Sequence, residues 1–209
     1  AVAMPLAINE SGTEHSYALT NDIDLIRKSS QSIYTKIPAW GILDKIFNYN
    51  GRIAFVGLPD QTASLRMISK EDKTIRNKIK YFLGPMVGIC MDKDVIAALP
   101  SILNQKNGEI KNLRWRDGEW PGSLNVKIDK KEHKISKFHY NYFLPFYCSH
   151  ESLLSDDFSN ELADISVGDA WSPKYEKLGL GWGLIWSKNM RGDKILQLML
   201  KAGRLSLNK

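Results

Sequence analysis

The sequence predicts an α/β protein in which a mixed sheet with flanking helices carries a small β-meander insertion. Short apolar runs alternate along the chain with segments of helical periodicity, which is typical of α/β folds. Residues 109–143 instead alternate apolar and polar side chains between DG, PG and DK turns, a pattern typical of antiparallel hairpins. The length of 209 residues fits a single domain, residues 1–209, with the insertion at about residues 109–145.

The first segments predict a strand followed by two helices. Residues 1–8 form an apolar run, hence a buried strand, and residues 20–30 show a short helical pattern with Thr20 or Asn21 as its N-cap. Another helix is expected to start at Pro38, because proline suits a first turn. Its core-facing stripe would comprise Trp40, Ile42, Leu43, Ile46 and Phe47.

The clearest strand–turn–helix unit lies in residues 52–68. Ile53–Val56 predicts a buried strand, GLPDQ (residues 57–61) a turn, and Thr62–Ile68 the first turns of a helix. Free backbone N–H groups meet at such a turn, so it can hold a phosphate or a carboxylate. The turn matches neither glycine-rich phosphate-binding pattern, and from the pattern alone a plain loop is the favoured interpretation.

The second half of the chain continues the alternation. Residues 79–91 are an apolar stretch broken by Gly-Pro, and residues 95–103 predict a helix that ends or kinks near its proline. After the meander, residues 163–171 and 182–188 predict strands. Residues 194–203 predict an amphipathic helix closed by glycine.

Composition excludes several classes of protein. The formal net charge is +6, but the basic residues are scattered, and the one dense run, residues 127–134, predicts a solvated hairpin rather than a nucleic-acid surface. Mild basicity suits anionic partners, such as phosphate-bearing cofactors or acidic subunits.

No apolar run reaches the ~20 residues of a membrane span, and no signal peptide is visible. Two cysteines, Cys90 and Cys148, make a reducing, cytoplasmic setting the default.

Few residues suggest chemistry by their pattern alone. Asp164 and Asp169 are five apart in a predicted strand, so their side chains should point to opposite faces rather than form an acid–base pair. His133, His139 and His150 lack the spacing of a metal motif. The tryptophans of the second half predict core and rim positions, on which a flat ring such as a flavin could stack.

Residues 151–158, ESLLSDDF, place two serines three apart between apolar neighbours and before two aspartates. By residue type this is the start of a helix. Ser152 and Ser155 suit capping positions, and Asp156 and Asp157 suit a first turn.

Several segments, taken in order, resemble the beta-subunit family of hydrogenases and formate dehydrogenases that exchange electrons with coenzyme F420. The most specific segment is DFSNELADISVGDAW, residues 157–171. Weaker matches are SIY (32–34), FVGLPDQ (55–61), GIC (88–90), WPGSL (120–124) and GLGWGLIWSK (179–188). Where the family has SKY, GxPCQ and GLFC, this chain has SIY, GLPDQ and GIC.

The resemblance implies an α/β fold with a smaller inserted sheet, FAD as cofactor, coenzyme F420 as substrate and usually a 4Fe–4S cluster. Flavin exchanges a hydride, and the cluster carries single electrons. The family's upstream GGxxT segment has no counterpart before Ala1, so the N-terminal part of the family domain is expected to be missing. The implied cofactor contacts are Ser32, Tyr34, Gly57, Pro59, Asp60, Gln61, Gly88, Gly168 and Asp169.

The family's cluster cysteines fall on Asp60, Cys90, Ser152 and Ser155. The chain departs from the family at three of these positions, and only Cys90 keeps its thiol. A serine hydroxyl stays protonated near neutral pH and is a poor ligand for iron–sulfur clusters. We therefore predict no metal ligands and no 4Fe–4S cluster.

The leading hypothesis is a flavin-containing, cytoplasmic oxidoreductase subunit that exchanges hydride or electrons with coenzyme F420 and associates with other redox subunits. The alternative is a non-catalytic relative that acts as a structural or docking subunit. The replaced cysteines favour the alternative, whereas a flavin site needs no cysteine and so favours the redox subunit.

Overall fold

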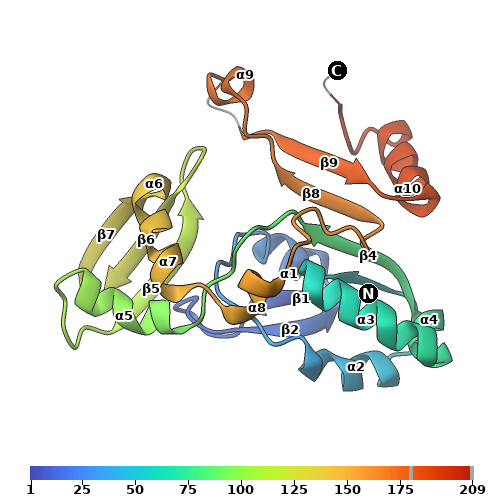
Figure 1. The fold of residues 1–209 in the computed structure, drawn as a ribbon, viewed down its shortest axis with the longest axis horizontal. Coiled ribbons are helices and arrows are strands. Elements are labelled where there is room, and N and C mark those ends of the chain that lie inside the picture. Colours follow the sequence, from blue (N-terminus) through green and yellow to red (C-terminus); the bar gives the residue numbers. More distant parts are fainter. Residues whose placement is uncertain (179–180, 208–209) are drawn as a thin grey trace.

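The computed structural model describes residues 1–178 and 181–207, so residues 179 and 180 of the GLGWGLIWSK match lie outside it. A six-stranded mixed sheet is flanked by helices, and a separate three-stranded antiparallel sheet lies beside it (Figure 1). The predicted fold class is confirmed.

The large sheet has the strand order β2-β1-β3-β4-β8-β9. The four inner strands are parallel, and both edge strands, β2 and β9, pair antiparallel with their neighbours. The carboxyl ends of β3, β4 and β8 therefore meet at one edge of the sheet, where α/β proteins commonly bind ligands. The strands are β1 (Val2–Ala7), β2 (His15–Thr20), β3 (Ile53–Val56), β4 (Ile79–Pro85), β8 (Ile165–Asp169) and β9 (Gly183–Ser187).

Helices α3 and α4 lie against the large sheet, and α5 to α7 accompany the small one (Figure 1). The α-helices are α1 (Ile23–Lys28), α2 (Leu43–Asn48), α3 (Pro59–Glu71), α4 (Lys73–Lys78), α5 (Asp94–Ile102), α6 (Lys137–Tyr140), α7 (Leu144–Tyr147), α8 (His150–Leu154), α9 (Pro173–Glu176) and α10 (Met190–Lys201). Two short 3-10 helices, η1 (Trp40–Ile42) and η2 (Asn141–Phe143), precede α2 and α7.

The small sheet consists of β5 (Ile110–Asp117), β6 (Ser123–Ile128) and β7 (Lys131–Ser136), joined as a meander. Alternate residues of β6, namely Leu124, Val126 and Ile128, are fully buried, as the apolar–polar alternation predicts. The segment after β7 is helical, so only the first part of the predicted insertion is sheet. The small sheet therefore has its own core, separate from that of the large sheet.

Local details correct three expectations. The N-cap of α1 is Asp22 rather than Thr20 or Asn21, because the Asp22 carboxylate accepts from the backbone N–H groups of residues 24 and 25. The helix expected to start at Pro38 begins instead with the 3-10 turn at Trp40, and Trp40 and Phe47 of the predicted stripe are exposed. The last helix begins at Met190, four residues earlier than expected, because the Asn189 side chain caps it.

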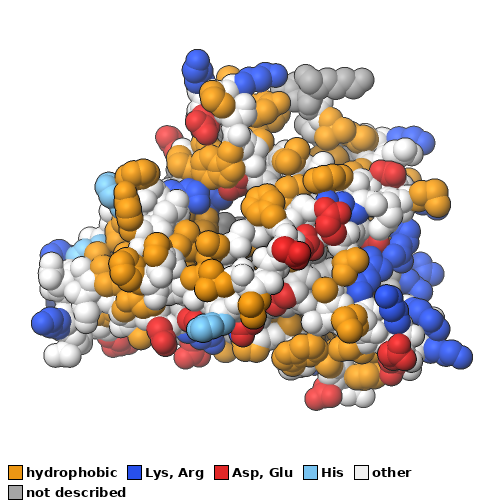
Figure 2. All heavy atoms as spheres, in the orientation of Figure 1, with side chains coloured by type: hydrophobic (Ala, Val, Ile, Leu, Met, Phe, Trp, Pro, Cys, Tyr) orange, Lys and Arg blue, Asp and Glu red, His pale blue; other side chains and the backbone are white. Residues whose placement is uncertain are grey.

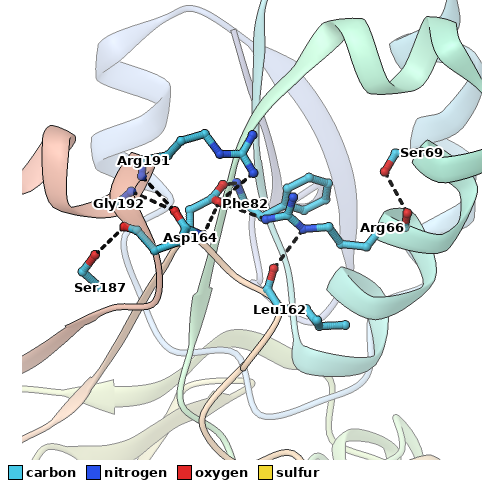
Figure 3. Close-up of polar contacts among 9 residues, drawn as sticks. Arg66, Ser69, Phe82, Leu162, Asp164, Ser187, Arg191 and Gly192 are labelled. Carbon is cyan, nitrogen blue, oxygen red and sulfur yellow. Dashed lines mark hydrogen bonds and ion pairs between the residues drawn. The ribbon is translucent and has the colours of Figure 1, made fainter.

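Asp164 ties the large sheet to the helices on either side of it (Figure 3). Its carboxylate is fully buried, accepts from the Phe82 N–H at 2.8 Å and pairs with Arg66 at 3.0 Å and Arg191 at 3.1 Å. The backbone of α10 approaches so closely that a Cβ at Gly192 would lie 2.2 Å from the Asp164 carbonyl oxygen. Asp164 is therefore a structural residue, which agrees with its predicted separation from Asp169.

Within residues 1–178 and 181–207, no helix combines the length and the apolar character that a bilayer crossing requires.

Candidate functional site

A small pocket lies where α3 begins, at the carboxyl ends of β3 and β4. The four positions that the family resemblance assigns to cluster cysteines, Asp60, Cys90, Ser152 and Ser155, all line it, although up to 95 residues separate them in sequence. Pro59, Gln61 and Gly88 line it too. We call it the α3–α8 pocket, after the two helices that contribute most of these residues.

The chain after β4 brings these residues together. Met91 forms isolated bridges with Thr35 on one side and Cys148 on the other. Backbone hydrogen bonds of 2.8 Å, from Lys36 N to Met91 O and from Ser149 N to Cys90 O, continue this pairing. The segment that carries Gly88 and Cys90 therefore runs between two others, and places Cys90 beside α8.

Two N–H groups at the turn into α3 are satisfied from within the protein. The Gly57 N–H donates to Leu83 O, and the Leu58 N–H donates to the Gln61 side-chain oxygen at 2.9 Å. Tyr17 donates to the same oxygen at 2.6 Å, and Pro59 has no N–H. The Gly57 and Leu58 N–H groups are thus not free for a phosphate. The prediction that residues 57–61 form a turn before a helix at Thr62 is corrected, because α3 already begins at Pro59. Gly57 is also needed for packing, since a Cβ there would lie 2.3 Å from the Phe55 ring.

Serine hydroxyls hold α8 against Cys90. Ser149 caps α8 by accepting from the Ser152 N–H, and its hydroxyl donates to the Ser152 hydroxyl at 3.1 Å. The Ser152 hydroxyl in turn accepts from the Cys90 N–H at 2.9 Å. The prediction that Ser152 and Ser155 start a helix is therefore wrong.

The earlier Ser149 is the cap, and the expected first turn is the end of the helix. Ser155 is the C-cap of α8, and Asp156 and Asp157 follow the helix.

An ion pair between Lys36 and Glu151 bridges the pocket's lining. The hydrogen bond from Lys36 is the main cause that lowers the pKa of Glu151. Neither residue carried a sequence signal, because the pair joins positions that are far apart in the chain.

Cys90 is buried, and its thiol is hard to ionise. Burial, and secondly the charge of Asp60, raises the pKa of Cys90 to about 12. Burial likewise raises the pKa of Cys148. Without a bound metal, Cys90 is therefore a thiol at neutral pH.

Several predicted contacts lie elsewhere. Tyr34 and Asp169 belong to a cluster of side chains that joins the small sheet to the end of β8. We call this cluster the sheet junction, and it comprises Tyr34, Arg116, Trp120, Lys137, Tyr140, Trp171 and Asp169. Gly168 precedes Asp169 but packs against Met86, whose sulfur would lie 3.0 Å from a Cβ there. Ser32 is half-buried on the loop before Tyr34, outside the lining of the α3–α8 pocket.

The sheet junction combines cations with aromatic rings. Arg116 pairs with Asp169 at 2.5 Å and lies 4.9 Å over the Trp120 ring. The Trp120 ring packs on Trp171 with centroids 4.6 Å apart. Lys137 lies 5.3 Å over the Trp171 ring. Sequence reasoning missed Arg116 and Lys137, since nothing local distinguishes them from other basic residues of a solvated sheet.

The comparisons with known proteins decide the family. A sequence model of the C terminus of the coenzyme F420 hydrogenase/dehydrogenase beta subunit matches residues 50–209. The chain belongs to this beta-subunit family. Among curated proteins it is similar to the F subunit of the F(420)H(2) dehydrogenase from Methanosarcina mazei, with 24% identity over 201 residues. That match covers 94% of this chain but 53% of the relative, so the chain spans about half the length of that protein.

The fold agrees with the family. A chain of the F420-reducing NiFe hydrogenase complex from Methanosarcina barkeri superposes with a TM-score of 0.71 and 15% identity. The match covers 97% of this chain and 67% of that one. The membership in the beta-subunit family that residues 157–171 and the weaker segments predict is thereby confirmed.

The α3–α8 pocket does not fit the iron–sulfur cluster that the family resemblance implies. Its volume is about 40 Å³, room for water but not for a cofactor ring, and hydroxyl and carboxylate side chains stand where a cluster would need thiolates. Of the four positions that the family resemblance assigns to cysteines, only Cys90 has a sulfur, and one thiol cannot hold a 4Fe–4S cluster. In residues 1–178 and 181–207, no group of three or more His, Cys, Asp or Glu could hold a metal ion.

Proposed function

We propose that this chain is a beta-type subunit of a coenzyme F420-linked oxidoreductase and that it works without an iron–sulfur cluster of its own. The carrying observation is the convergence of Asp60, Cys90, Ser152 and Ser155 on one pocket that is lined by serine hydroxyls and an ion pair. The Ser152 hydroxyl accepts from the Cys90 N–H, so this side chain has a structural partner that needs no metal. We also take residues 1–209 as one domain of the family, with the meander inserted.

The flavin part of the proposal rests on the sheet junction rather than on the pocket. FAD would supply hydride chemistry, which suits exchange with coenzyme F420 and needs no metal. Trp171, about half exposed and packed on Trp120, offers a flat apolar face, and Lys137 places a positive charge above it. These residues would bind and orient a ring and shield one side of it from water. Tyr34 and Asp169 stay cofactor-binding candidates.

Partner subunits are part of the proposal. Exposed apolar side chains gather over α6 and α7 in Figure 2, and others follow on and after α8. They are Phe138, Tyr142, Phe146, Leu153, Leu154 and Phe158, all more than 60% exposed. Contiguous exposed apolar side chains mark interaction surfaces more often than chance allows. The same surface supports the second candidate function, a docking subunit without a cofactor.

Two free cysteines suit a reducing, cytoplasmic location for either function.

The visible absorption spectrum separates the two candidates. The full chain is purified anaerobically, incubated with FAD and freed of excess by gel filtration. A retained flavin band, bleached by reduced coenzyme F420, supports the redox subunit. Protein that stays colourless after this treatment refutes the flavin part and leaves the docking subunit.

A further inference from the structure

The fold gathers basic side chains from two separate stretches of the sequence onto one surface. Residues 44–52 and 70–80 contain seven basic and three acidic residues, so they carry +4 of the chain's formal net charge of +6. The densest basic run of the sequence, residues 127–134, carries +2. Figure 2 shows Lys and Arg side chains gathered over α4 and the end of α3. We call the exposed basic residues of the two stretches the α4 patch: Lys45, Arg52, Lys70, Lys73 and Arg76.

The packing of α4 brings these residues together. Helix α4 contacts α2, α3 and β4. Asp72 ends α3 and caps α4, so Lys70 and Lys73 stand on either side of one corner. The first residue of β3 is in register with Ile79, the first residue of β4, so Arg52 lies beside the end of α4. The patch therefore covers the amino ends of β3 and β4.

Two exposed aromatic side chains adjoin the α4 patch. The Lys78 ammonium donates to the carbonyl of Ile46 at 3.2 Å and to that of Phe47, which holds the end of α2 against α4. The 3-10 turn η1 continues into α2, and Trp40 and Phe47 are seven residues apart on this helical segment, hence on one side of it. The two side chains are 60% and 41% exposed. Apolar rings therefore lie next to the positive charge.

Stabilisation of helix ends accounts for only part of the α4 patch. Lys70 and Arg76 lie in the last turns of α3 and α4, where a positive charge is favourable. Lys73 lies in the first turn of α4, where a positive charge is unfavourable, and Arg52 precedes a strand. Within the part of the chain that the structure describes, none of the five basic residues has an acidic oxygen within 4.0 Å. Like charges that lack acidic partners repel one another, so an anionic partner would be favourable here.

The position of the α4 patch suits an extended surface as its partner. The charges are spread over the ends of three helices and the start of a strand, and none of the five residues lines the α3–α8 pocket. That pocket lies where α3 begins, whereas the patch lies where α3 ends. A helix of thirteen residues separates the two by about 20 Å. A surface bound at the patch would therefore leave the pocket accessible.

We infer that the α4 patch binds the anionic surface of a lipid bilayer, with Trp40 and Phe47 in the headgroup region. A bilayer presents many negative headgroups in one plane, which suits charges that are spread over several elements. Aromatic rings beside basic side chains are typical of proteins that lie on a membrane, because the headgroup region accommodates both. An acidic protein or a nucleic acid would balance the charge alone. The inference is independent of the proposed function, since it uses no residue of the α3–α8 pocket or the sheet junction.

The test is sedimentation of the purified chain with lipid vesicles at about 0.1 M salt, where surface charges are only partly screened. The vesicles consist of phosphatidylcholine alone or of phosphatidylcholine mixed with phosphatidylglycerol. One variant combines Lys70→Gln, Lys73→Gln and Arg76→Gln, and a second carries Trp40→Gln. Binding of fluorescent polyglutamate and of duplex RNA is measured by anisotropy at the same salt. Thermal melting checks that each variant is folded.

The matched control combines Lys130→Gln, Lys131→Gln and Lys134→Gln. These three lysines are exposed on the small sheet and belong to the densest basic run of the sequence. The control therefore removes the same net charge as the triple variant of the α4 patch, but from another surface.

We expect the wild type to sediment with the anionic vesicles and not with the neutral ones. Each lost charge of the patch should weaken binding about fivefold, so the triple variant should bind about 100-fold more weakly. The control should lose less than about threefold. Trp40→Gln should weaken binding about tenfold through the lost apolar contact.

Three results would overturn the inference. The first is wild-type protein that stays in solution with the anionic vesicles. If polyglutamate or RNA binds in that case, the patch serves an acidic protein or a nucleic acid instead. The second is an equal loss in the triple variant and the control, because net charge alone would then explain the binding. The third is unchanged vesicle binding in Trp40→Gln, which would show that no ring enters the headgroup region.

Discussion

Replacing Asp164 should destabilise the fold more than any other single loss of charge in the large sheet. Its carboxylate accepts from the Phe82 N–H, from the Asn189 side chain at 2.8 Å and from Arg66 and Arg191. Asp164→Ala removes all of these contacts, whereas Asp164→Asn keeps an oxygen for Phe82. The two substitutions therefore separate the loss of charge from the loss of the backbone acceptor.

The magnitude follows from the exposure of each partner. Arg66, 23% exposed, should contribute about 1.5–3 kcal/mol as a charged hydrogen bond, and Arg191, 53% exposed, about 0–1 kcal/mol. The Phe82 N–H, left buried without an acceptor, adds about 1–3 kcal/mol. We expect Asp164→Ala to lower the free energy of unfolding by about 3–5 kcal/mol and Asp164→Asn by about half as much.

Urea denaturation followed by tryptophan fluorescence measures both values. The control is Asp24→Ala, because the Asp24–Arg27 pair is exposed on both sides, and its loss should cost less than about 1 kcal/mol. If Asp164→Ala costs no more than this control, Asp164 is not the tie between the sheet and α10, and the reasoning from buried partners fails.

Two further predictions concern Cys90 and Gly192. Because the pKa of Cys90 is raised from 9.0 to about 12, the folded state holds this proton longer than the unfolded state. The resulting stability is complete below pH 9.0 and should fall above it by about 1.4 kcal/mol per pH unit, a slope that Cys90→Ala should lose in urea titrations. A slope unchanged in Cys90→Ala would contradict the buried thiol. Gly192→Ala should cost about 1–3 kcal/mol in the same assay, because its Cβ meets the Asp164 carbonyl, whereas Gly41→Ala meets nothing within 4 Å. Equal effects of the two glycine variants would show that α10 can move away.

The strands were predictable because their signal is local. Ile53–Val56 and the alternating residues of β6 carry burial in their own pattern, and both are strands. The helix expected at Ser152 failed for a local reason as well. Ser149 stands one turn earlier and caps α8 instead. By residue type Ser149 and Ser152 are equally good N-caps, so the sequence pattern does not decide between them.

The sites were less predictable because their contacts are distant in sequence. Arg116 meets Asp169 across 53 residues, and Lys36 meets Glu151 across 115. No periodicity or spacing records such pairs. The convergence of Asp60, Cys90 and Ser152 followed from the family resemblance and not from residue types, since an aspartate, a cysteine and a serine have no common pattern.

The central claim is that this family member lacks an iron–sulfur cluster because its ligands are replaced, while the fold around them is retained. The most direct measurement is iron and acid-labile sulfide after anaerobic reconstitution of two proteins, the wild type and the triple variant Asp60→Cys, Ser152→Cys, Ser155→Cys. The account predicts no bound cluster in the wild type, and a brown, cluster-loaded triple variant in which Cys90 completes four thiols. Near-stoichiometric iron and sulfide in the wild type would contradict the account.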